Sequence, residues 1–115
     1  MTQTEALCLT LAIEVPVAVA LVHWRRWAPG RLGVVALVSV LASVVTHPLL
    51  WLVDPVLQPA LGAPVRWALL ETLIALVEAA VYALGAGIGA RRALATSFLA
   101  NGVSFGVGLA IYSSG

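Results

Sequence analysis

The residues in this sequence that could do chemistry are polar side chains placed inside long apolar stretches. They include three carboxylates, one imidazole, one amide and one hydroxyl group. These six candidate site residues are Glu14, His47, Glu71, Glu78, Asn101 and Ser104. Such side chains are costly in an apolar environment, so each one needs a partner or a function.

The spacing of these residues indicates shared helix faces. Glu71 and Glu78 are seven residues apart, which places them on one stripe of a helix. Asn101 and Ser104 are three apart and fall on one stripe of a later segment. An ionised side chain at the centre of a bilayer costs roughly 2.5–3.5 kcal/mol. We therefore expect these stripes to face one another inside a helix bundle.

A rise of about 1.5 Å per helical residue gives the depth of each group. Counted from the outer ends of the apolar segments, the six residues lie between about 7 and 18 Å deep, in the outer half of a membrane. The other half carries no acid in its interior. This distribution predicts a polar pocket that opens outward and is closed toward the cytoplasm by apolar packing.

Carboxylates and an imidazole at staggered depths are suited to holding a proton or a small cation. The leading hypothesis is that the pocket binds such an ion for transport. Alternatively, the same side chains could bind a divalent metal ion. The ligands would be Glu14, His47, Glu71 and Glu78, and the metal would be Zn, Mn or Fe. No two of these residues form an H-x-x-x-H or E-x-x-H pair within one helix, so the spacing favours the proton or cation.

Three other interpretations use the same residues. The first is a buried hydrogen-bond network that only stabilises the bundle. The second is an accessory or assembly subunit of a larger membrane complex. The third is an intramembrane metal-dependent hydrolase that acts on a lipid-like substrate. A single intramembrane histidine is a small ligand set for a metalloenzyme, so the sequence favours a protein that is not an enzyme.

The elements that must position these residues are membrane-spanning helices. Of the 115 residues, 62% are hydrophobic and 10% are charged, and the mean hydropathy is +1.05. Soluble domains contain about 45–50% apolar and about 25% charged residues. We predict an all-α integral membrane protein, a single transmembrane domain over 1–115 that forms a four-helix bundle with short loops. The expected spans are residues 5–22, 32–53, 66–86 and 93–112.

The same composition excludes several classes of protein. A net charge of +1 is too small for the basic surface of a nucleic-acid-binding protein. The four spans leave too few residues for a separate soluble enzyme domain. Cys8 is the only cysteine, so the sequence allows no intrachain disulfide.

The arginines predict the orientation. Five of the six lie between spans one and two or between spans three and four, and Arg66 lies on the other side. The positive-inside rule places both of these arginine-rich loops in the cytoplasm and both termini outside the cytoplasm, in a plasma or inner membrane. Aromatic residues agree, with Trp24 and Trp27 at one interface and Trp51, Trp67 and Tyr112 at the other. Three prolines predict an irregular surface loop over 54–64.

Partners are expected in the membrane. Four helices of this length are too few to enclose a translocation path, so we expect a homo-oligomer or other membrane subunits in addition to the lipid bilayer. Two pairs of glycines, Gly85 with Gly89 and Gly102 with Gly106, allow close approach of helices within the bundle or between protomers.

Overall fold

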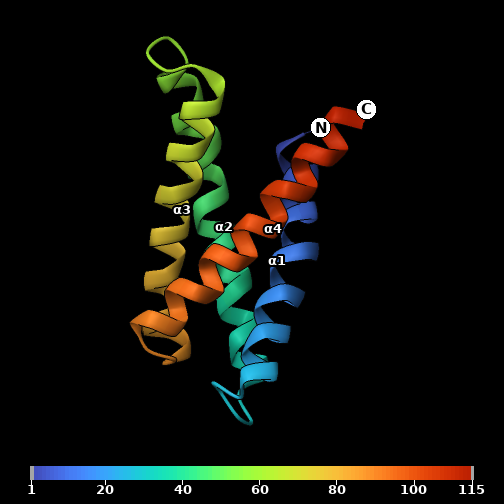
Figure 1. Ribbon diagram of the computed structural model, residues 1–115, viewed down its shortest axis with the longest axis vertical. Coiled ribbons are helices and arrows are strands. Elements are labelled where there is room, and N and C mark those ends of the chain that lie inside the picture. Colours follow the sequence, from blue (N-terminus) through green and yellow to red (C-terminus); the bar gives the residue numbers. More distant parts are fainter. Residues whose placement is uncertain (1, 115) are drawn as a thin grey trace.

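The computed structural model describes residues 2–114, with side chains over residues 2–111, so the Tyr112 side chain lies outside the described part. Residues 2–114 form four helices joined by short loops: α1 (Gln3–Arg25), α2 (Leu32–Leu57), α3 (Ala63–Ala86) and α4 (Ala90–Ser114) (Figure 1). The predicted all-α four-helix bundle is confirmed.

All four helices are long and apolar enough to cross a membrane. The longest dimension of the molecule is 45 Å, close to the thickness of a bilayer with its headgroup regions, about 40–45 Å. Large apolar side chains cover the outer surface, and Leu52, Val56 and Leu84 are 69%, 73% and 89% exposed. A surface of this kind is suited to lipid rather than to water.

The helices pack as a ring in which each contacts its two neighbours. Close backbone contacts join α1 to α2, α2 to α3, α3 to α4 and α4 back to α1, whereas among the described residues the backbones of neither diagonal pair come close together. Both termini and the 58–62 loop lie at one end of the molecule (Figure 1). We call this the open end, and the end with residues 26–31 and 87–89 the closed end.

An apolar core fills the bundle toward the closed end. It includes Ala18 and Val22 from α1, Val35 from α2 and Tyr82 from α3, each at most 1% exposed. Arg31 donates from Nη1 to the carbonyl oxygen of Ala86 at 3.0 Å and so binds the first loop to the last turn of α3. Free carbonyls at a helix C-terminus favour such a cation. The packing leaves little space at this end.

The α2 and α3 backbones approach closely at Gly85. A Cβ atom at this position would lie 2.9 Å from Cγ2 of Val38, which is closer than two carbon atoms can pack. By contrast, no heavy atom of the described residues outside its own helix lies within 4 Å of a Cβ built at Gly102 or Gly106. Of the predicted small-residue contacts, the one at Gly85 is therefore made within the chain.

The expected loop over 54–64 is shorter than predicted. The α2 helix continues through Pro55 to Leu57, where Gln58 donates its backbone N–H to the carbonyl oxygen of Asp54 at 3.1 Å. Pro64 lies in the first turn of α3, where a missing N–H costs nothing. The proline count misled the prediction because proline is tolerated in membrane helices and at helix starts.

The start of α1 has a cap that the prediction of the first span did not use. Thr2 Oγ1 accepts from the Glu5 backbone N–H at 3.1 Å, and Glu5 Oε2 accepts from the Thr2 N–H at 3.3 Å. This is a capping box, and its Thr-x-x-Glu pattern is visible in the sequence. It explains why the helix begins at Gln3.

Candidate cation-binding cavity

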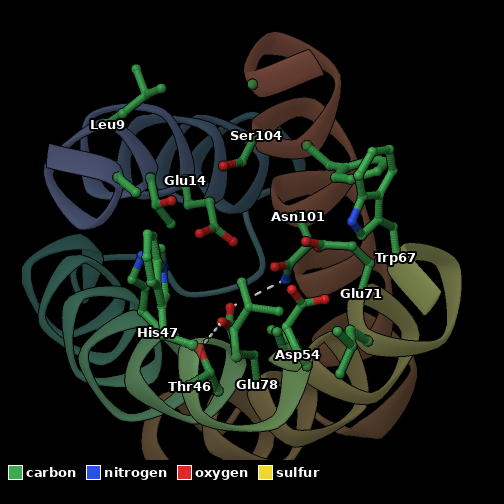
Figure 2. Close-up of a pocket in the computed structure, with 18 of the residues that line it drawn as sticks. Leu9, Glu14, Thr46, His47, Asp54, Trp67, Glu71, Glu78, Asn101 and Ser104 are labelled. Atoms are coloured by element: carbon green, nitrogen blue, oxygen red, sulfur yellow. Dashed lines mark hydrogen bonds between the residues drawn. The ribbon is translucent and has the colours of Figure 1, made fainter. Parts of the chain in front are cut away.

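A cavity of about 480 Å³ lies between the four helices in the half of the bundle toward the open end. All six candidate site residues line it: Glu14, His47, Glu71, Glu78, Asn101 and Ser104. They come from all four helices, as Figure 2 shows. Residues that are up to 90 positions apart in the chain thus share one cavity because the helices form a ring.

Glu14 and Glu78 form the floor of the cavity. Both are only 2% exposed, and both side chains line the same cavity (Figure 2). Ser43 donates from Oγ to Oε2 of Glu14 at 3.4 Å. Oε1 of Glu14 is buried and accepts no hydrogen bond from an amide, hydroxyl or amine group of the described residues. Two buried carboxyl groups in this arrangement need a proton or another positive charge between them.

The contacts of Thr46 indicate where one proton lies. Its Oγ1 is 2.6 Å from Oε2 of Glu78 and 2.9 Å from the carbonyl oxygen of Ala42. A hydroxyl group has one proton to donate, so it makes a full hydrogen bond to only one of these acceptors. Both contacts are satisfied when Thr46 donates to Ala42 and a protonated Glu78 donates to Thr46. The geometry therefore fits a neutral Glu78.

Asn101 holds the other oxygen of Glu78. Its Nδ2 donates to Oε1 of Glu78 at 3.2 Å and to the carbonyl oxygen of Ser97 at 2.8 Å. Ser97 in turn donates from Oγ to the carbonyl oxygen of Ala75 at 2.6 Å, which joins α4 to α3. These bonds orient the Glu78 carboxyl group and keep it in place.

His47 is on the wall of the cavity and already has a partner. Its Nε2 accepts from Nε1 of Trp51, one turn further along α2, at 3.1 Å. An imidazole nitrogen that accepts an N–H carries no proton of its own and has its lone pair engaged. This contact favours a neutral His47 and makes its Nε2 unavailable to a metal ion.

The open end of the cavity carries an ion pair. Nε of Arg66 lies 2.6 Å from Oδ1 of Asp54, and Arg66 also donates from Nη1 to the carbonyl oxygen of Leu61 at 3.2 Å. Both side chains line the cavity, as do the half-buried Glu71 and Ser104. Arg66 is the one basic residue among the lining residues, and Asp54 engages it.

The metal alternative receives no support from the geometry. Within residues 2–114, no group of three or more histidine, cysteine, aspartate or glutamate side chains is placed to hold a metal ion. The four residues named as ligands share the cavity, but their donor atoms do not converge on one point. Their side chains come from three different helices and lie at different depths.

Three side-chain contacts in the cavity were not predicted from the sequence. Thr46 contacts Glu78, Trp51 contacts His47, and Asp54 pairs with Arg66. The spacing of His47 and Trp51, four residues apart on a helix, could have predicted their contact. The other two contacts join different helices, and the sequence carries no signal for them.

No protein-family model, curated protein or solved structure matches this chain.

Proposed function

We propose that this membrane protein binds a proton or a small cation at the Glu14 and Glu78 carboxyl pair as a step in transport. The observation that carries the proposal is the pair itself: two acids, each 2% exposed, at the floor of an open cavity. Acids inside membrane segments are costly and typically mark ion pathways or proton relays.

The charges around the pair support this function. Glu71 lines the same cavity as Glu14 and Glu78, so three carboxyl groups share one site. Among the described residues that line the cavity, the positive charge of Arg66 is already engaged by Asp54. The carboxyl pair therefore favours an ion from outside the chain, and a proton is the smallest one that fits.

The polarity of the molecule gives the direction of access. Following the positive-inside rule, the arginine-rich closed end lies in the cytoplasm and the cavity opens to the other side. Passage to the cytoplasm requires a second conformation in which the apolar core opens, or a second copy of the chain. We expect a homo-oligomer for this reason.

The test is ion flux into liposomes that contain the purified protein. Glu78→Gln keeps the amide contacts to Asn101 and Thr46 possible but removes the titratable group. We expect it to lower proton or cation flux at least tenfold, measured with a pH-sensitive dye or ion-sensitive dyes under an imposed gradient. Size-exclusion chromatography and circular dichroism would check that the variant is folded.

Glu5→Gln is the matched control, because Glu5 is an exposed acid of the same chain and glutamine also serves in a capping box. Its flux should equal that of the unmodified protein. Unchanged flux in Glu78→Gln, or an equal loss in both variants, would overturn the proposal.

A further inference from the structure

The cavity is much larger than a proton or a metal ion requires. Its volume is about 480 Å³, whereas one water molecule occupies about 30 Å³ in the liquid. Sites for small organic molecules have volumes of about 300–1,000 Å³. The size therefore indicates a ligand with a body of several heavy atoms.

The walls of the cavity are apolar and aromatic above an acidic floor. Leu9, Leu50 and Leu70 line it with the rings of Trp51, Trp67 and Phe105. Aliphatic side chains favour a hydrocarbon body, and aromatic faces attract organic cations. A site with apolar walls and a few polar groups is the usual arrangement for an organic ligand.

The charge of the cavity selects against anions. Glu14, Glu71 and Glu78 all line it, and Arg66 is engaged by Asp54 at 2.6 Å. The imidazole of His47 accepts a hydrogen bond from Trp51 and so adds no positive charge in this arrangement. A ligand that enters this cavity gains from carrying a positive charge.

Oε1 of Glu14, at the floor of the cavity, lacks a hydrogen-bond donor. Glu14 is 2% exposed, its side chain points into the space between the helices (Figure 2), and its Oε1 accepts no hydrogen bond from an amide, hydroxyl or amine group of the described residues. A buried polar atom without a partner lowers the stability of the folded protein. An ammonium N–H would satisfy it, and a quaternary ammonium group could not.

We propose that the ligand of this cavity is an organic ammonium ion with a compact apolar body, held by Glu14 and surrounded by the aromatic wall. This inference rests on the proposed cation function and names its substrate class. The ammonium group lies at the acidic floor, and the apolar body lies between Trp51, Trp67 and Phe105.

The experiment measures binding of two probes to the full chain in phosphatidylcholine nanodiscs by isothermal titration calorimetry. 2-Phenylethylamine is charged and donates N–H bonds, and 2-phenylethanol has the same apolar body without a charge. Empty nanodiscs correct for partition into lipid. We expect saturable binding of the amine that is at least tenfold tighter than binding of the alcohol.

Variants separate the site from general effects. Glu14→Gln should weaken amine binding at least tenfold and leave alcohol binding unchanged, while Glu5→Gln should bind both probes as the unmodified protein does. If Glu14→Gln does not fold, Glu71→Gln takes its place with an expected loss of at least threefold for the amine. Glu71 is half-buried, so this substitution disturbs packing less.

Three results would overturn the inference: no saturable amine binding, equal affinity for amine and alcohol, or equal effects of the cavity variant and Glu5→Gln. Loss of amine binding with intact proton flux would contradict the substrate class and leave the proposed function standing. If the protein binds the amine but shows no proton or cation flux, transport is contradicted and the binding site is still supported.

Discussion

At the scale of single residues, the Glu78 carboxyl group has the most complete set of contacts in the cavity. Thr46 and Asn101 hold its two oxygens, at 2.6 Å and 3.2 Å. Glu14 lacks such support at Oε1. The two acids therefore have different tasks in our proposal: Glu78 is the oriented proton carrier, and Glu14 is the group that receives the ligand.

Thr46→Val tests the contact to Glu78. Valine has nearly the same shape but no hydroxyl group, so the substitution leaves Oε2 of Glu78 without its partner at 2.6 Å. We expect the free energy of unfolding to fall by about 1–3 kcal/mol, the cost of a buried unsatisfied polar group. Unfolding in a denaturing detergent, followed by circular dichroism, measures the change.

Thr72→Val is the control for Thr46→Val. Thr72 also donates to a backbone carbonyl four residues earlier, at 2.7 Å, but its side chain is exposed. Loss of the Thr72 hydroxyl group should change the free energy of unfolding by less than about 0.5 kcal/mol, as is usual for surface substitutions. Equal losses for the two variants would contradict a special role of Thr46 at Glu78.

At the scale of the elements, each helix combines a lipid-facing surface with a polar or small inner face. On α2 the inner face contains Ser39, Ser43 and Thr46, each at most 2% exposed. On α3 it contains Glu78 and, further toward the closed end, the close contact of Gly85 with Val38. This contact joins α2 and α3, the two helices that carry Thr46 and Glu78.

Gly85→Ala tests this helix contact. The added Cβ would lie 2.9 Å from Cγ2 of Val38, so α2 and α3 must move apart or Val38 must change its rotamer. Overpacking of this kind costs about 1–3 kcal/mol, and we expect a loss of that size in the free energy of unfolding. The double variant Gly85→Ala with Val38→Ala should recover part of it.

Gly102→Ala is the matched control on α4, where no described heavy atom outside the helix lies within 4 Å of the new Cβ. Alanine is the better helix former by about 1 kcal/mol, so stability should stay equal or rise. A loss at Gly102 with none at Gly85 would show that the close α2 and α3 contact is not the one that matters.

At the scale of the whole molecule, the two ends of the bundle differ. The open end holds the cavity, both termini and the 58–62 loop. The closed end holds an apolar core and two arginine-rich segments, in which Arg25 and Arg92 both lie over the ring of Trp27, at 5.9 and 5.7 Å from its centroid. Charges and aromatic rings at this end suit a cytoplasmic interface.

Cysteine labelling tests the orientation. Cys8 is the only cysteine and is replaced by serine, and single cysteines are then introduced by Ala60→Cys at the open end or Ala90→Cys at the closed end. Both positions are exposed. A membrane-impermeant maleimide should label intact cells at least tenfold more at position 60, and position 90 should react only after permeabilisation.

If position 90 is labelled in intact cells and position 60 is not, the orientation is opposite to the predicted one. The cavity would then open to the cytoplasm, and the positive-inside rule would have failed for this chain. Equal labelling of both positions in intact cells would contradict a single orientation.

The lipid environment of this protein and its four helices could be predicted from the sequence alone. Of the residues, 62% are hydrophobic, and in lipid a helix forms all the hydrogen bonds that its backbone needs. The rare polar residues indicated which face of each helix points inward. The position of each polar residue along its helix could be counted from the sequence, because the rise per residue in a helix is constant.

Which side chains meet could be seen only once the helices were packed against one another. The order of the helices around the ring brings Thr46 to Glu78 and places Glu14 in the same cavity. Asp54, expected in a loop, lies on α2 and engages Arg66. These contacts depend on the relative positions of different helices, which follow from packing across the whole bundle and not from spacing within any one segment.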